Sequence, residues 1–216
     1  MKLKIEEYKN GTRMSPALAE SYNKVGEAHE MLGYYEEAVQ AYEQAVVFDQ
    51  GCAEAYFKLG GAYIRLERYQ EAVEALRESI RINPDCADAY NYLGVAYNDL
   101  GWYQEAVKAY EQGIRMNPYD AVAYYNLAGA YGNIGEYDKR IELYLHSILF
   151  DPDCAEAHYN LGLSYWKLSR HQEAVDSYKQ AIRINPDYAD AYNNLGIAFR
   201  ELGLYHEAVE AFRQAI

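Results

Sequence analysis

Small and apolar residues recur along this chain with a period of 34 residues. Four prolines keep that spacing, and so do five glycines with an alanine in the remaining place: Pro84, Pro118, Pro152 and Pro186; Gly26, Gly60, Gly94, Ala128, Gly162 and Gly196. A fixed period of this length indicates an architecture of stacked repeats. It divides the chain into a lead-in, 1–18, and six units: 19–52, 53–86, 87–120, 121–154, 155–188 and the shorter 189–216.

Each unit carries two stripes of apolar and small residues. Numbered from the first residue of a unit, positions 4, 7, 8, 11 and 14 share one face of a helix, and positions 17, 20, 24 and 27 share one face of a second helix. A turn containing glycine, such as Gly101 or Gly135, separates the two stripes. Small residues such as Gly94 and Ala106 allow the two helices of a unit to approach each other closely. We therefore expect a pair of antiparallel helices in every unit.

The ends of these helices also have sequence signals. Asn-Pro or Asp-Pro closes the second helix, because the residue before proline avoids helical angles. We expect three aspartates to cap the next helix, each with an acidic residue three positions on: Asp85 with Asp88, Asp153 with Glu156, and Asp187 with Asp190. The fourth unit, with Tyr119 and Val122 at these places, is expected to lack such a cap. Ser15 and Pro16 predict the start of the first helix, and residues 1–12 are expected to be loosely ordered.

The order of residues within a unit resembles the tetratricopeptide repeat. The third unit shows it as Tyr90, Leu93, Gly94, Tyr97, Tyr103, Ala106, Tyr110 and Pro118, with tyrosine in place of the usual first tryptophan. The resemblance covers residues 19–216 and accounts for most of the 25 tyrosines as packing residues. It implies an all-α fold, a right-handed α-solenoid superhelix of about six helix-turn-helix units, each touching only its neighbours. In such proteins the first helices line a concave groove that binds peptides.

Two sets of residues lie on the face of the first helices that packing leaves free. One is a strip of aromatic and aliphatic residues: Tyr92, Val95, Tyr125, Tyr159, Leu163, Trp166 and Ile197. Asn193 lies on the same face beside this strip. Exposed apolar patches usually mark contact sites. The other is a run of amides, which both donate and accept hydrogen bonds and so suit a peptide backbone: Asn126, Asn160 and Asn194. Similar asparagine ladders line superhelical tetratricopeptide domains, including that of O-linked N-acetylglucosamine transferase, although the ladder here covers three units only. The domain as a whole also resembles those of bacterial and archaeal tetratricopeptide proteins. The alternative is that these residues pack against neighbouring units.

The fourth unit departs most from the pattern. Arg140 stands where the other units have alanine, and glycines crowd its first helix. Each glycine inside a helix costs about 1 kcal/mol relative to alanine. On the outer face of its second helix, Leu145 and Leu149 replace residues that are mostly polar elsewhere. These features predict a flexible joint with a small convex contact patch, unless the repeat has simply drifted.

Composition narrows the partners and the chemistry. The net charge of −13 argues against nucleic acid, whose binding depends on lysine and arginine, and favours basic or neutral partners. No run reaches the roughly 18 apolar residues of a membrane span, and the first residues lack the apolar core of a signal peptide. The three cysteines, Cys52, Cys86 and Cys154, form no CxxC pair and are odd in number, which favours a reducing compartment and a cytoplasmic location. All three share one repeat position, where Cys52 and Cys86 of neighbouring units lie too far apart to bridge, so we expect reduced, buried cysteines. No metal, nucleotide or nucleophile motif is present, so we expect no metal, no cofactor and no enzyme activity.

The sequence therefore predicts a protein-protein interaction scaffold that binds a peptide segment or partner protein in its concave groove. The alternative is the substrate-recognition arm of a larger enzyme, such as a glycosyltransferase, whose catalytic domain is absent from this chain. The last helix reaches Ile216 without a polar capping helix after it. A solenoid normally needs such a cap. We therefore expect that the protein continues, or that this end packs on another copy by self-association.

Overall fold

The computed structural model describes residues 15–216. Over that range the chain forms twelve α-helices and no strand, which confirms the predicted all-α helical-repeat fold. The chain divides into two compact units, the first ending at Met116 and the second comprising Asn117–Ile216. The boundary falls at the end of the second helix of the third repeat, so each unit holds three helix pairs. The prediction of loosely ordered residues 1–12 lies outside the described residues.

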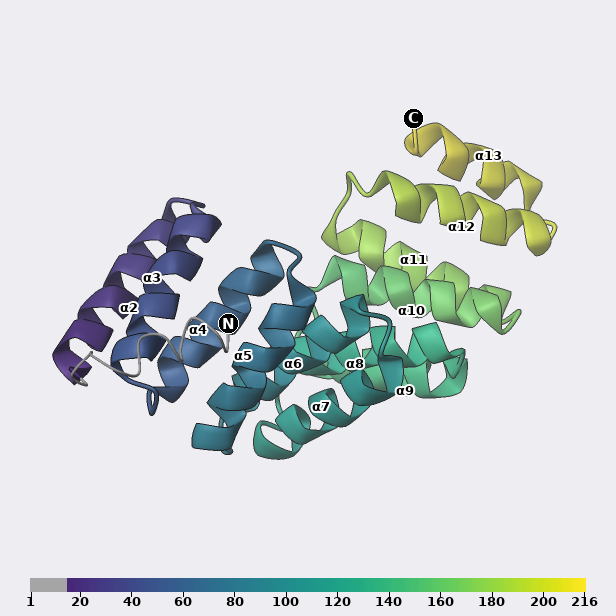
Figure 1. Ribbon diagram of the computed structural model, residues 1–216. Coiled ribbons are helices and arrows are strands. Elements are labelled where there is room, and N and C mark those ends of the chain that lie inside the picture. Colours follow the sequence, from purple (N-terminus) through teal and green to yellow (C-terminus); the bar gives the residue numbers. More distant parts are fainter. Residues whose placement is uncertain (1–14) are drawn as a thin grey trace. The chain divides into compact units, whose positions relative to one another are not determined.

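Each unit is a row of three helix pairs, and the two helices of a pair lie side by side (Figure 1). The first unit contains α2 (Pro16–Met31), α3 (Tyr35–Phe48), α4 (Ala53–Arg65), α5 (Tyr69–Ile82), α6 (Ala87–Asp99) and α7 (Tyr103–Met116). The second unit contains α8 (Ala121–Ile134), α9 (Tyr137–Phe150), α10 (Ala155–Lys167), α11 (His171–Ile184), α12 (Ala189–Glu201) and α13 (Tyr205–Gln214). The predicted start of the first helix is confirmed, with Ser15 as the N-cap and Pro16 as the first helical residue.

An aromatic ring packed on a glycine sets the spacing of the two helices in most pairs. A Cβ atom added at Gly94 would lie 2.6 Å from Cδ1 of Tyr110, and one added at Gly162 would lie 2.6 Å from Cε1 of Tyr178. Both tyrosines are fully buried. Since no side chain fits between ring and backbone, position 8 must be glycine wherever the ring opposite is placed in this way.

In the fourth repeat a different glycine faces the second helix, and it contacts an arginine rather than an aromatic ring. Position 8 of this repeat is Ala128, and its second helix carries Arg140 one turn before the buried Tyr144. The Arg140 guanidinium lies 5.4 Å from the Tyr144 ring centre, and a Cβ atom at Gly132 would meet Cδ of Arg140 at 2.9 Å. Gly132 thus makes room for the arginine, a packing role that the sequence did not reveal. The flexible joint stays a prediction.

Neighbouring pairs are joined by a shared core and by polar contacts at its edge. In the second unit Val175 and Tyr178 of α11 belong to one buried cluster with Leu195 and Phe199 of α12. In the first unit Tyr63 of α4 donates a hydrogen bond to Glu43 of α3 at 2.8 Å.

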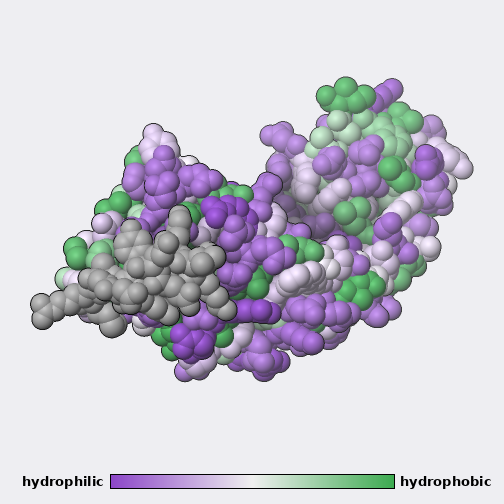
Figure 2. Space-filling view, viewed as in Figure 1, coloured by the Kyte–Doolittle hydropathy of each residue, from purple (hydrophilic) through white to green (hydrophobic). Residues whose placement is uncertain are grey.

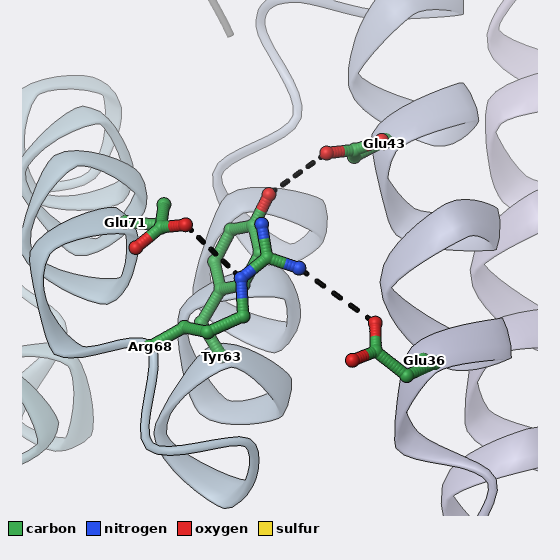
Figure 3. A network of polar contacts seen from close by, with 5 residues as sticks. All are labelled: Glu36, Glu43, Tyr63, Arg68 and Glu71. Carbon is green, nitrogen blue, oxygen red and sulfur yellow. Dashed lines mark hydrogen bonds and ion pairs between the residues drawn. The ribbon is translucent and has the colours of Figure 1, made fainter.

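Arg68 completes the polar edge of that joint. Its guanidinium lies over the Tyr63 ring and pairs with Glu71 and, at 3.7 Å, with Glu36 (Figure 3). Burial and the Glu43 carboxylate raise the pKa of Tyr63 well above its usual range, so the hydroxyl keeps its proton as a donor.

The predicted aspartate caps are wrong by one position. The N-caps of α6, α10 and α12 are Cys86, Cys154 and Tyr188, none of which accepts a hydrogen bond through its side chain. The aspartates belong instead to the preceding turn, in which the Asn83 side chain accepts the N–H of Asp85 at 3.3 Å. The acidic residues three places on do lie in the first helical turn, where they suit the helix dipole.

The fourth repeat, expected to lack an aspartate cap, has one. The Asp120 carboxylate accepts the N–H groups of Val122 at 3.0 Å and Ala123 at 3.1 Å. Asp120 occupies the repeat position that holds cysteine in three other repeats. It directly follows Tyr119, the residue from which the absence of a cap was inferred. The three cysteines are free, and as N-cap residues they are half-buried rather than buried as expected.

The turn inside each pair needs a left-handed backbone. Gly33, Gly101, Gly135 and Gly203 have φ between +76° and +88° at this turn. Two repeats place a residue with a side chain at the same position, Glu67 with φ of +58° and Ser169 with φ of +57°. A residue with a Cβ atom pays about 1–2 kcal/mol for this conformation, and glycine avoids that cost.

We expect Glu67→Gly to raise the free energy of unfolding by about 1 kcal/mol, because it removes the left-handed strain. Chemical denaturation followed by circular dichroism measures the change. Glu67→Ala is the matched control, since it removes the carboxylate but keeps Cβ, and it should give no gain. Equal gains from both variants would show that charge rather than backbone strain is responsible.

Candidate functional site

Nine of the eleven predicted groove residues lie on the three first helices of the second unit. They are half-buried except for Asn193, which is exposed. Helix α8 supplies Tyr125 and Asn126; α10 supplies Tyr159, Asn160, Leu163 and Trp166; α12 supplies Asn193, Asn194 and Ile197. We call this surface the α8–α10–α12 face.

Tyrosines and asparagines on this face are paired across neighbouring repeats. The Asn160 amide donates to the Tyr125 hydroxyl at 2.9 Å, and the Asn194 amide donates to the Tyr159 hydroxyl at 2.8 Å. Asn160 and Asn194 therefore do pack against neighbouring repeats, which was the alternative to a role in ligand binding. The pairs leave the hydrogen of each tyrosine hydroxyl and the oxygen of each amide for a further partner.

The aromatic rings are held from several sides. Tyr125 lies 5.6 Å from Tyr144, and Tyr159 lies 5.9 Å from Tyr178 and 4.9 Å from Tyr188, measured between ring centres. Burial is the main cause that raises the pKa of Tyr125 and Tyr159 and, with Glu156 nearby, raises that of Tyr188 to about 12. The hydroxyls therefore keep their protons near neutral pH. Rings fixed in this way lose little conformational entropy when a ligand binds.

The far end of α10 adds one more aromatic group. Trp166 is half-buried, and its ring lies 4.7 Å from that of His171 at the start of α11. Leu163, one turn earlier on α10, packs at the edge of the core cluster formed by α11, α12 and α13, as does Trp166. The predicted aromatic and aliphatic residues of the second unit thus combine partial burial with partial exposure, which suits apolar contact with a ligand.

A hollow of about 260 Å³ opens beside Tyr125. Its lining residues are Ala121, Val122, Tyr125, Ser147, Asp151, Cys154 and Glu156. The Ser147 hydroxyl donates a hydrogen bond to the carbonyl oxygen of Ala121 at 2.9 Å. Asp151 and Glu156 are exposed, and neither carboxylate forms an ion pair with the part of the chain that the structure describes.

The two carboxylates give the hollow a negative potential. Burial raises the pKa of the Cys154 thiol, and Glu156 and Asp151 add to the shift. Sequence reasoning missed Asp151 because Asp-Pro was interpreted only as a helix end. The signal was available, since three other repeats carry an uncharged asparagine at this position: Asn83, Asn117 and Asn185.

The remaining two groove residues belong to the first unit. Tyr92 and Val95 lie on α6; Tyr92 is 43% exposed, and its ring meets that of Phe57 edge-on at 5.2 Å between centres. Phe57 and Tyr92 occupy the same two repeat positions as Tyr125 and Asn160. This joint of the first unit therefore uses an aromatic pair, where the two corresponding joints of the second unit use a hydrogen-bonded pair.

The predicted convex patch lies on α9. Leu145 and Leu149 are 48% and 67% exposed, so both are accessible to a partner, and their use as a contact stays a prediction. Among residues 15–216, no group of three histidine, cysteine or acidic side chains could hold a metal ion. None of the helices described is long and apolar enough to cross a membrane.

Comparison with known families identifies the repeat. Models described as tetratricopeptide repeat match residues 12–85, 57–121, 109–142, 155–188 and 177–210, and one described as TPR repeat matches residues 133–169. The chain belongs to the tetratricopeptide repeat (TPR) family. A comparison with curated proteins finds no match.

Solved TPR structures share this fold. A structure described as "Crystal structure of MamA" is 28% identical with a TM-score of 0.70, covering 73% of this chain and 92% of its own. One described as "Crystal structure of YrrB: a TPR protein with an unusual peptide-binding site" is 25% identical with a TM-score of 0.69, covering 88% and 94%. MamA from Desulfovibrio magneticus RS-1, 23% identical with a TM-score of 0.75 over 82% and 99% of the two chains, shows likeness of fold alone.

The Tyr159–Asn194 hydrogen bond predicts energetic coupling between two TPR repeats. We expect Tyr159→Phe to lower the free energy of unfolding by about 1 kcal/mol in the wild type and by much less in an Asn194→Ala background. Thermal unfolding of the four chains measures this coupling. In the control cycle Asn193→Ala replaces Asn194→Ala, and the effects should add. Equal coupling in the two cycles would contradict a specific bond.

Proposed function

We propose that this TPR protein is an interaction scaffold and that its α8–α10–α12 face binds an extended peptide segment of a partner protein. The observation that carries the proposal is the pair of hydrogen bonds from Asn160 to Tyr125 and from Asn194 to Tyr159. They fix aromatic rings and amides at corresponding points of successive repeats. Membership of the TPR family and the fold of the solved relatives support a scaffold role.

The chemistry of the face suits an extended peptide. Each tyrosine presents a hydroxyl hydrogen and each paired asparagine an amide oxygen, so a peptide carbonyl and N–H could both be satisfied. Tyr159 and Trp166 supply apolar area beside these groups for the side chains of the peptide. Because intramolecular contacts already hold the rings in place, ordering them costs little free energy when a peptide binds.

The carboxylates beside Tyr125 favour a lysine or arginine in the ligand. Asp151 and Glu156 border a hollow large enough for a side chain, next to a tyrosine ring that also attracts cations. The overall charge of −13 adds long-range attraction for a basic segment. We therefore expect the preferred peptide to combine a basic residue with apolar or aromatic residues.

This role holds whether the chain acts alone or as the substrate-recognition arm of a larger enzyme. In both cases these residues bind and orient a partner, and the proposal assigns them no reaction. YrrB, which shares this fold, is likewise described as having a peptide-binding site. A peptide screen addresses the binding step directly in either setting.

We expect the triple variant Tyr125→Ala, Tyr159→Ala, Trp166→Ala to lose peptides that the wild type captures on an array, with affinity falling at least about tenfold. The reason is the loss of the apolar anchors and of both hydroxyl partners. Fluorescence titration with the best peptide quantifies the change.

The matched control replaces two other tyrosines and one other tryptophan, Tyr34→Ala, Tyr119→Ala and Trp102→Ala, all of which are exposed. Circular dichroism checks that both variants stay folded. If the groove variant keeps the wild-type peptides, the α8–α10–α12 face is not the site. The exposed surface around Leu145 and Leu149 would then be tested next.

A second variant tests the acidic hollow. We expect Asp151→Asn with Glu156→Gln to weaken basic peptides about tenfold while leaving neutral peptides unchanged, because only the charge attraction is removed. Titrations at low and high salt should show that the difference shrinks as salt screens the charges. Asp176→Asn with Glu207→Gln makes the same change in net charge elsewhere on the second unit. An equal loss in that control would indicate general charge attraction rather than this hollow.

A further inference from the structure

We propose that the hollow beside Tyr125 selects an arginine of the bound peptide, whose guanidinium packs on the Tyr125 ring and pairs with Asp151 and Glu156. The inference rests on the proposed function, in which a peptide lies on the α8–α10–α12 face. It narrows the expected basic residue to arginine and places it at one repeat. The hollow measures about 260 Å³ and is lined by these three residues and by Cys154, among others.

The next repeat shows what fills the corresponding space. Tyr125 and Tyr159 both occupy position 5, and each hydroxyl accepts a hydrogen bond from an asparagine of the following repeat. Position 34 differs, since it holds Cys154 in the fourth repeat and Tyr188 in the fifth. The Tyr188 ring packs against the Tyr159 ring, with 4.9 Å between centres and 38° between planes. The hollow beside Tyr125 is therefore the place that an aromatic ring occupies one repeat later.

The backbone at position 34 has the same form in both repeats. Cys154 has φ of −78° and ψ of 97°, and Tyr188 has φ of −80° and ψ of 80°. Each is the N-cap of the helix that follows. Since Cβ then points in the same direction, the short Cys154 side chain does not reach the region that the Tyr188 ring fills. A flat group from a ligand has room to pack on Tyr125 there.

Two carboxylates at the hollow are open to a ligand. At position 31 the side chains of four other repeats accept the backbone N–H two residues on, at 2.9 to 3.4 Å: Asp49, Asn83, Asn117 and Asn185. Asp151 occupies the same position, and its carboxylate accepts no such bond within residues 15–216. Glu156 receives a weak contact from the Cys154 thiol, at 3.8 Å. Both carboxylates can therefore accept hydrogen bonds from a donor bound in the hollow.

The chain itself contains arginines held in this manner. The Arg68 guanidinium carbon lies 4.5 Å from the centre of the Tyr63 ring, and its Nε pairs with Glu71 at 3.0 Å (Figure 3). Arg170 lies at the same distance from the Tyr165 ring and pairs with the glutamate three residues on. The hollow supplies the ring and the carboxylates of this arrangement. An arginine of the peptide would complete it.

Arginine fits this hollow better than other side chains. Its guanidinium is flat, packs on aromatic faces and donates parallel hydrogen bonds, whereas the lysine ammonium is a compact, strongly hydrated charge. A neutral aromatic side chain would pack on the ring but would leave the carboxylates without a positive partner. On the face of the second unit seen in Figure 2, hydrophilic residues separate most of the hydrophobic ones, which favours selection by individual side chains over burial of one broad apolar patch.

Four pools of capped peptides test the choice of residue. The pools share random flanking residues and differ only in a fixed central arginine, lysine, citrulline or tyrosine. We expect the full chain to bind the arginine pool about fivefold more tightly than each of the others, as measured by fluorescence anisotropy. Lysine keeps the charge without the flat group, and citrulline keeps the flat shape without the charge, so the two comparisons separate these contributions.

Filling the hollow should remove the preference. Cys154→Tyr places a ring where Tyr188 has one in the next repeat, so binding of the arginine pool should fall to the level of the lysine pool. Cys86→Tyr makes the same change at the same repeat position in the first unit and should leave the preference intact. Circular dichroism checks the fold of both variants. Tyr125→Leu removes the ring without filling the hollow, and it should also make the two pools bind alike.

The outcomes separate this inference from the proposed function. Pools that bind the wild type but not the triple variant of Tyr125, Tyr159 and Trp166, without preferring arginine, would keep the peptide site and overturn the selection of arginine. A preference for the tyrosine pool would overturn it as well, as would an arginine preference that survives both Cys154→Tyr and Tyr125→Leu. If no pool binds, or if the triple variant binds every pool like the wild type, the proposed function fails and this inference fails with it.

Discussion

The close contact between a ring on the second helix and a glycine on the first is the constraint on which most of this structure depends. At Gly94 and Gly162 the ring occupies the space of the missing side chain. This contact fixes the distance between the two helices, so each pair becomes a rigid block with two apolar sides. Blocks of this kind can only be stabilised by stacking, which explains why sequence period and architecture coincide.

Stacking in turn decides which residues remain for recognition. The positions that face neither the partner helix nor the next repeat form one surface per unit, and its residues lie at regular intervals. Tyr125 and Tyr159 serve both purposes, since each ring packs against a buried tyrosine while its hydroxyl joins an asparagine of the next repeat. A ligand on this surface would therefore meet groups whose positions the fold has already set.

The sequence predicted the architecture well because the repeat period is a strong, redundant signal. Six copies of the stripe pattern located every helix pair, and Ser15-Pro16 located the first helical residue. The features that the sequence analysis placed wrongly or missed depend on shifts of one residue or on contacts between repeats. Asp85 looked like a cap, but the preceding asparagine draws it into a turn, while the capping role of Asp120 lies at a position where other repeats have cysteine. The hydrogen bonds between Tyr and Asn join residues 35 apart, a pairing that no local pattern encodes.

The same positions carry different chemistry in the two units, and this difference explains how one repeat can support specific recognition. Where position 5 meets position 6 of the next repeat, the first unit has the Phe57–Tyr92 ring contact, and the second has hydrogen bonds between tyrosine and asparagine. None of these exchanges alters the ring-on-glycine contacts that space the helices. Stability and specificity therefore reside in separate repeat positions, so the binding surface can change residue by residue while the helix pairs keep their packing.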